Sequence, residues 1–132
     1  MTRRNIASSS PWEATVGYSR AVRIGNLVEV AGTTAVDAHG TVVGANDPYR
    51  QAQFALERIG RALASAGARF EDVVRTRMCV TDIARWEDVG RAHGEVFRDI
   101  RPASTLVQVQ ALVRPDLLVE IEATALIPEG SR

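Results

Sequence analysis

Alternating apolar residues near the start of the chain predict two adjacent strands. Residues 20–32 read RAVRIGNLVEVAG, in which apolar side chains recur at every second position on both sides of Gly25-Asn26. A Gly-Asn pair is typical of the two-residue turns with positive φ that join antiparallel strands. The segment therefore predicts a β-hairpin.

Helical spacing follows in two later segments. Asp47-Pro48 is a typical helix start, because Asp caps the first amides and Pro suits the first helical position. Gly67 is a typical helix end. The apolar residues between them share one helical face: Ala52, Leu56, Ile59 and Leu63. After a strand predicted over residues 70–80, Asp82 is expected to begin a second helix, and we interpret its His93 as a packed, half-buried side chain.

The last part of the chain, residues 103–126, predicts a closing hairpin around a turn at residues 114–116. Alternation places Ser104 and Leu106 on the same face as Glu120, where leucines mix with glutamines and glutamates. The opposite face is apolar and is expected to carry the helices. A mixed face of this kind indicates partial cover by another subunit.

Together these elements predict an α+β fold, with a mixed sheet and two helices packed on one of its faces. A length of 132 residues suits one domain, so a single domain over residues 1–132 is expected. The formal net charge of +0 gives no general attraction to nucleic acid or to an anionic membrane. No apolar run approaches the roughly 20 residues of a membrane span, and the N-terminus lacks the apolar region of a signal peptide. We therefore expect a cytoplasmic protein without nucleic-acid or membrane partners.

Sequence motifs for catalysis are few. The chain contains no lysine, which excludes a lysine Schiff base and a Walker-type phosphate lysine. It has no Gly-rich phosphate loop, no nucleophile elbow and no spacing typical of metal ligands, so no metal is expected. Glu120 and Glu122 are paired carboxylates on one strand face, suited to acid–base chemistry or to hydrogen bonds across an interface. Tyr18, before the first hairpin, is either a pocket wall or a cover for the edge of the core.

Three stretches of the chain resemble a known family: GYSRAVRIGNLVEVAGTTAVD, ALASAGARFEDVVRTRMCVTD and RPASTLVQVQALVRPDLLVEIEATA. They resemble the RidA/YjgF family of reactive-intermediate imine deaminases, also called L-PSP endoribonucleases, over nearly the whole chain. The resemblance implies a chorismate-mutase-like α+β fold and a homotrimer with small-molecule pockets between subunits. The well-studied branch hydrolyses 2-enamine and 2-imine intermediates to 2-keto acids and ammonia, and it needs no cofactor or metal.

The resemblance also assigns candidate site residues. Glu120 matches the carboxylate that positions the attacking water. The candidate pocket lining comprises Tyr18, Gly32, Gly90, Ser104, Thr105 and Leu106. Tyr18 and Gly32 match the family, whereas Gly90 stands where the family has asparagine and Leu106 where it has cysteine. Ala31 likewise replaces a serine.

The largest departure from the family is at Ser104. The deaminase branch reads Pro-Ala-Arg-Ser, where the arginine holds the substrate carboxylate, and this chain reads Pro-Ala-Ser-Thr. A serine hydroxyl cannot reproduce the bidentate, charge-assisted pair that a guanidinium forms with a carboxylate. Arg101 lies three residues earlier and would start from the opposite side of the strand, and we interpret it as a surface or interface side chain.

Two hypotheses follow for the activity. The first is a hydrolase for an enamine or imine intermediate other than the usual 2-imino acids, with Glu120 orienting water. The second is a non-catalytic trimer that binds a small molecule or regulates a partner. A ribonuclease has the least support, because the chain is neutral and shows no basic strip with interleaved aromatic residues.

Overall fold

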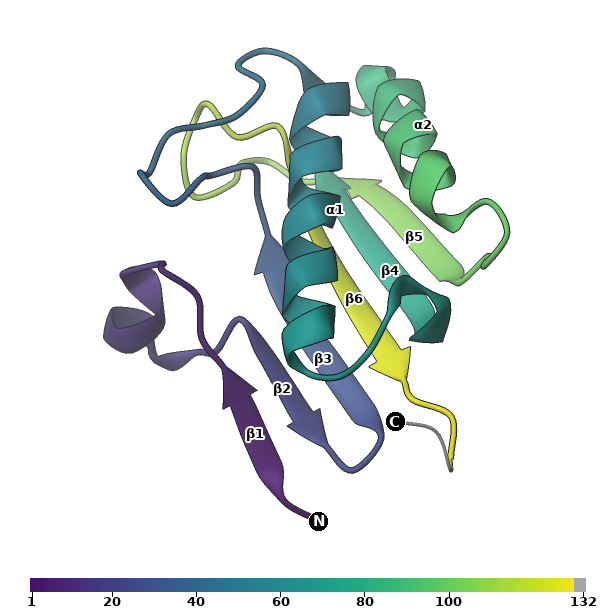
Figure 1. The fold of residues 1–132 in the computed structure, drawn as a ribbon. Helices are drawn as coiled ribbons and strands as arrows, with labels where there is room; N and C mark the ends of the chain where they lie inside the picture. Colours follow the sequence, from purple (N-terminus) through teal and green to yellow (C-terminus); the bar gives the residue numbers. More distant parts are fainter. Residues whose placement is uncertain (130–132) are drawn as a thin grey trace.

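The computed structural model describes residues 1–129, so the last three residues of the predicted domain lie outside the described residues. The described residues form a six-stranded sheet with the order β1-β2-β3-β6-β4-β5, and α1 and α2 lie side by side on one of its faces (Figure 1). The strands are β1 Arg3–Ile6, β2 Ala21–Ile24, β3 Leu27–Thr33, β4 Val73–Val80, β5 Ala103–Gln108 and β6 Val119–Leu126. The helices are α1 Pro48–Ser65 and α2 Trp86–Phe97, with short turns η1 Glu13–Gly17, η2 Phe70–Asp72 and η3 Ile83–Arg85. This arrangement confirms the predicted α+β class.

The first hairpin and the first helix follow their local sequence signals. β2 and β3 pair antiparallel around a turn in which Gly25 has a φ of 59°. The side chain of Asp47 accepts a hydrogen bond from the amide of Arg50 at 3.1 Å, and α1 begins at Pro48. Gly67 follows the helix with a φ of 83°, a left-handed conformation that costs glycine little.

The strand predicted over residues 70–80 begins three residues late. Phe70–Asp72 forms a 3₁₀ turn, closed by a hydrogen bond from the amide of Asp72 to the carbonyl of Arg69 at 3.0 Å. The Asp72 carboxylate also accepts from the Arg69 amide, so local hydrogen bonds compete with the sheet here. The predicted cap at Asp82 likewise belongs to the short turn η3, and α2 begins only after that turn.

The predicted closing hairpin is wrong. β6 lies between β3 and β4 and pairs antiparallel with both, whereas β5 pairs parallel with β4 at the sheet edge. A parallel pair needs a crossover connection, and α2 supplies it between β4 and β5. β6 is buried at every second residue, which suits a central strand, while β5 is exposed or partly exposed along its length.

This order also overturns the predicted faces of β5. Ser104 is opposite Thr76 and Leu106 is opposite Met78, and both of those β4 residues are buried on the face that the helices cover. Glu120 is on the uncovered face. Ser104 and Leu106 therefore share a face with α2 and not with Glu120. Periodicity could not decide this, because each face of the edge strand carries both polar and apolar residues.

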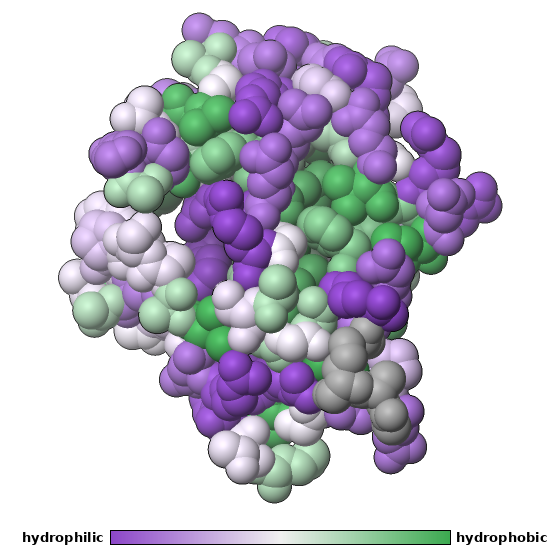
Figure 2. All heavy atoms as spheres, in the orientation of Figure 1, coloured by the Kyte–Doolittle hydropathy of each residue, from purple (hydrophilic) through white to green (hydrophobic). Residues whose placement is uncertain are grey.

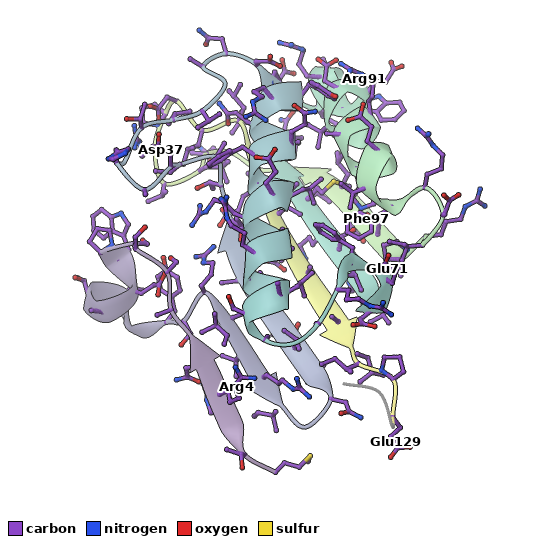
Figure 3. All side chains as sticks on the ribbon, viewed as in Figure 1. Arg4, Asp37, Glu71, Arg91, Phe97 and Glu129 are labelled. Atoms are coloured by element: carbon purple, nitrogen blue, oxygen red, sulfur yellow. The ribbon has the colours of Figure 1, made fainter. Side chains whose placement is uncertain are left out.

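The core lies between the sheet and the two helices. Phe97 is 2% exposed and meets the ring of Phe70 edge-on, with centroids 5.5 Å apart; it points from α2 into the interior (Figure 3). The uncovered face of the sheet instead exposes Leu27, Leu126 and Val107 beside charged side chains. The expectation that a second subunit covers this face stays a prediction.

Buried Gln51 connects α1 to the segment that enters β6. Its Nε2 donates to the carbonyls of Gly44 and Asp116, both at 3.1 Å, and its Oε1 accepts from the amide of Leu118 at 2.9 Å. These bonds satisfy the carbonyl of Asp116 and the amide of Leu118, and they add to the bond that the carbonyl of Gly44 accepts from the amide of Asp47 at 3.0 Å. Gln51 thereby fixes the chain two residues before Glu120.

None of the helices in residues 1–129 combines the length and the apolar character that a membrane crossing requires.

Candidate functional site

A cavity of about 650 Å³ opens on one flank of α1. The N-terminal segment before η1, the loop after β3 and the loop before β6 form its other walls. Hydrophilic side chains gather on this flank (Figure 2), and Asp37 lies in the loop that overhangs it (Figure 3). Three of the predicted site residues line the cavity, and they are Tyr18, Gly32 and Glu120.

Glu120 and Gly32 face each other across β3 and β6. The register between these strands shifts between Val30 and Thr33, which places Gly32 against the Glu120 side chain. A Cβ at position 32 would collide with Oε2 of Glu120, so only glycine leaves room for the carboxyl group in this position. The local geometry therefore explains the pairing of these two predicted residues.

The carboxyl group of Glu120 is half-buried. Burial raises its pKa, the nearby charge of Glu122 raises it further, and Arg20 partly offsets the rise. A carboxylate with a raised pKa is a better proton acceptor than an ordinary one. The environment of Glu120 thus suits a general base.

Four arginines line the cavity, and none of them was predicted from the sequence; two, Arg20 and Arg58, are fixed by hydrogen bonds to the chain around β3. Nη1 of Arg20 donates to the carbonyl of Gly32 at 3.0 Å and to Oγ1 of Thr33 at 2.8 Å. Nη1 of Arg58 donates to the carbonyl of Thr34 at 2.7 Å. Burial lowers the pKa of Arg58, and the positive charges of Arg20 and Arg61 lower it further.

The one sequence feature that relates Arg58 to the cavity is its spacing along α1. It shares one face of α1 with Phe54, Ala62 and Ser65, and all four line the cavity. Helical periodicity alone could not show that this face bounds a cavity, because charged residues usually mark a solvated face.

A second group of predicted residues lies between β4, β5 and α2. Oγ1 of Thr76 donates to Oγ of Ser104 at 2.8 Å and lies 2.8 Å from Nε2 of His93. Burial lowers the pKa of His93, which keeps its imidazole neutral at neutral pH. A Cβ at position 90 would make only ordinary van der Waals contact, at 3.9 Å from the ring of Trp86.

Within one chain, the predicted site residues therefore lie in separate places. Neither Ser104 nor Gly90 nor Leu106 lines the cavity that holds Glu120. Thr105 is on the uncovered sheet face, where its hydroxyl accepts from Nη2 of Arg75 at 3.1 Å. The predicted lining thus forms a Glu120 group, an α2–β5 group and a separate Thr105.

Arg101 is exposed at the entrance to β5. Its Nε donates to the carbonyl of Arg98 at 3.1 Å, and it does not line the cavity. The position agrees with the interpretation of Arg101 as a surface or interface side chain.

Among the residues that the structure describes, no three histidine, cysteine, aspartate or glutamate side chains gather closely enough to hold a metal ion. The chemistry available in the cavity is that of a basic carboxylate, a phenol ring and the guanidinium groups of four arginines. Such a set can orient a water molecule and bind a small anion.

Comparisons with known proteins agree on the fold. A model of the endoribonuclease L-PSP family matches residues 8–127. The uncharacterized protein SCO2049 of Streptomyces coelicolor is 41% identical over 122 residues, or 92% of this chain and 90% of its own length. The 3-aminoacrylate deaminase RutC of Acinetobacter baylyi is 34% identical over 108 residues, or 82% of this chain and 85% of its own length. The crystal structure of Rv2704 from Mycobacterium tuberculosis, a member of the YjgF/YER057c/UK114 family, has a TM-score of 0.87 and 51% identity and covers 96% of this chain and 100% of its own. The superposition confirms the predicted chorismate-mutase-like fold.

Proposed function

The chain belongs to the endoribonuclease L-PSP family, also named YjgF or Rid, and from this premise we propose that it hydrolyses an enamine- or imine-type reactive intermediate. The observation that carries the proposal is the half-buried carboxyl group of Glu120, which faces Gly32 in a cavity that Tyr18 also lines. The relative named 3-aminoacrylate deaminase supports the reaction class.

In the proposed reaction Glu120 acts on water. Its carboxylate orients a water molecule and accepts a proton as the water oxygen bonds to the imine carbon. That proton passes to the nitrogen and gives a carbinolamine. The hydroxyl proton of the carbinolamine then moves to the nitrogen as the C–N bond breaks and the C=O bond forms, and the products are a carbonyl compound and ammonia. Water is the co-reactant, so the reaction consumes no redox equivalent.

A complete pocket is proposed to form between subunits of a homotrimer. Two observations support this. The α2–β5 group with Ser104 lies apart from the cavity with Glu120 within one chain, and the uncovered sheet face exposes large apolar residues. A neighbouring chain that covers this face can bring the two groups together. The proposed location is the cytoplasm.

The test of the hydrolase is a series of three-carbon imines. An amino-acid oxidase generates 2-iminopropanoate from alanine, and base-promoted loss of HCl from N-chloroamines generates 3-iminopropanoate and propan-1-imine. Semicarbazide traps each imine, and the protein competes with the trap. We expect faster loss of an imine without a carboxylate on the imine carbon than of 2-iminopropanoate. If the protein accelerates the loss of none of the imines, the hydrolase is ruled out, and the hypothesis of a non-catalytic trimer that binds a small molecule is favoured.

Restoring the family arginine is expected to change this preference. Ser104→Arg should raise kcat/KM for 2-iminopropanoate by about 10- to 100-fold, the equivalent of a charge-assisted hydrogen bond of roughly 1.5–3 kcal/mol. Ser104→Gln adds similar polar reach without the charge and is the matched control. The same semicarbazide competition measures both variants, and an equal gain in the two would contradict a role for the charge.

A further inference from the structure

Three of the four arginines in the cavity wall form no ion pair within residues 1–129, and two of these three, Arg20 and Arg58, are held by hydrogen bonds to the backbone. Arg20 is only 5% exposed, and its Nε is buried without a hydrogen-bond partner among the described residues. Its Nη1 is held by the Gly32 carbonyl and the Thr33 hydroxyl. Arg58 is half-buried and is held through Nη1 by the carbonyl of Thr34. Within residues 1–129 neither arginine forms an ion pair.

Such an arrangement costs stability in the absence of a ligand. A buried charge is normally paired, because its desolvation is otherwise uncompensated. Here the two positive charges also repel each other, since Arg20 contributes to the lowered pKa of Arg58. Arg20 acts on Glu120 as well, where it opposes the rise in pKa. The three groups therefore share one electrostatic environment, and an anion would relieve the repulsion in it.

The other charged residues around the cavity offset this pair only in part. The negative charge of Glu13 opposes the lowering of the pKa of Arg58, but its carboxylate accepts from the amide and hydroxyl of Ser8. Arg61 adds a third positive charge to the same wall. Arg114 is already engaged with the carboxylate of Asp116 at 3.1 and 2.8 Å. The carboxylate of Asp37 accepts hydrogen bonds from two backbone amides of its own loop. No ion pair within residues 1–129 neutralises Arg20 or Arg58, so this wall can take up an acidic ligand.

We propose that Arg20 and Arg58 form an anion subsite that holds the acidic group of a small organic acid in the cavity of Glu120. Guanidinium groups bind carboxylates through charge-assisted hydrogen bonds, and the bonds from Arg20 to β3 hold it in place before the ligand arrives. The choice of substrate class rests on the proposed hydrolase function. In the family an arginine at the position of Ser104 holds the substrate carboxylate. Arg20 and Arg58 would hold the acidic group instead, from a different wall of the site.

The position of the subsite selects the substrate. A ligand carboxylate and the Glu120 carboxylate repel each other, so the acidic group is expected at the α1 wall and the C=N bond near Glu120. This favours an enamine or imine whose acidic group is separated from the imine carbon, such as 3-iminopropanoate. 2-Iminopropanoate carries its carboxylate on the imine carbon and fits this arrangement less well.

Binding of stable carboxylates tests the subsite without any catalysis. Calorimetric titration with propanoate and with neutral propanamide gives the affinities. Trp12, which lines the cavity, reports the location of binding by its fluorescence in a Trp86→Phe background. We expect propanoate to bind more tightly than propanamide and to change the Trp12 emission. Arg58→Gln should weaken propanoate binding by about tenfold or more, and Arg58→Lys by less.

The matched control is Arg50→Gln, which removes one positive charge from the same helix outside the cavity wall. Its affinity for propanoate should equal that of the unchanged protein. Equal affinities for propanoate and propanamide, or an unchanged propanoate affinity in Arg58→Gln, would overturn the proposal.

Hydrolysis separates this inference from the function on which it rests. We expect 3-iminopropanoate to be hydrolysed at least about tenfold faster than propan-1-imine, and Arg58→Gln to remove most of the difference. If propanoate binding requires Arg58 but no imine is hydrolysed, the subsite stands and the hydrolase fails. If both imines are hydrolysed equally and Arg58→Gln changes neither rate, the hydrolase stands and the subsite is overturned.

Discussion

Glu120→Gln is expected to lower kcat/KM for the preferred imine by about 10²- to 10⁴-fold, the usual contribution of a positioned general base. The amide keeps the size of the side chain but cannot accept the proton of the attacking water. The substitution should leave the fold intact, because the Glu120 carboxyl group is half-buried and faces the cavity. Semicarbazide competition measures the rate, and thermal unfolding checks the fold.

Gly32→Ala provides a companion test of position. Its Cβ would collide with the Glu120 carboxylate, and the flexible end of that side chain can move aside. We expect a loss of activity with little loss of stability, although the base itself remains. Full activity in Glu120→Gln would show that Glu120 does not act on the water, and full activity in Gly32→Ala would show that the present position of its carboxyl group is not needed.

The pH profile should report the same carboxyl group. The base works in its deprotonated form, so activity should rise as the pH increases through the pKa of Glu120. That pKa is raised by burial and by the neighbouring charge of Glu122. Glu122→Gln removes the repulsion, so the midpoint of the profile should move to lower pH. An unchanged midpoint would mean that another group controls the profile.

Gln51→Leu is expected to lower the free energy of unfolding by about 2–4 kcal/mol, because it leaves two part-buried backbone groups unpaired at roughly 1–3 kcal/mol each. The groups are the carbonyl of Asp116 and the amide of Leu118, whereas the carbonyl of Gly44 keeps its bond from the amide of Asp47. Urea unfolding measures the loss. Activity should also fall, because the segment that enters β6 loses its attachment to α1.

Gln53→Leu is the control for that loss. Gln53 lies on the same helix, is only half-buried, and donates to the hydroxyl of Tyr49 at 2.8 Å. A substitution of this kind usually changes the stability by about 0.5–1 kcal/mol. Similar losses in the two variants would show that the backbone hydrogen bonds of Gln51 contribute little.

Elements with short-range signals were predictable. The Gly25-Asn26 turn and the Asp47-Pro48 helix start lie where the sequence placed them. The order of the last strands was not predictable in the same way, because pairing between β3, β4 and β6 joins residues far apart in the chain. Two successive alternating segments predict a hairpin in the simplest case. Here α2 forms a crossover connection, so β5 pairs parallel with β4 instead.

The candidate site shows the same limit. Glu120 and Tyr18 were candidates from their place in the sequence, the family resemblance assigned their roles and added Gly32, and the three line one cavity. Arg20 and Arg58 were missed, because no pattern in the sequence distinguishes an arginine that turns into a cavity from one that lies in solvent. Ser104 was placed on the face of Glu120, since alternation gives two faces without stating which of them the helices cover.

The separation of the Glu120 group from the α2–β5 group has a genetic consequence. In the proposed trimer each pocket would take one group from each of two chains. An allele that damages Glu120 and an allele that damages the surroundings of Ser104 would then complement each other, because some pockets of a mixed trimer receive two intact groups. Two alleles that damage the same group could not do so. Mutations would therefore fall into two complementing classes, one for the Glu120 group and one for the α2–β5 group.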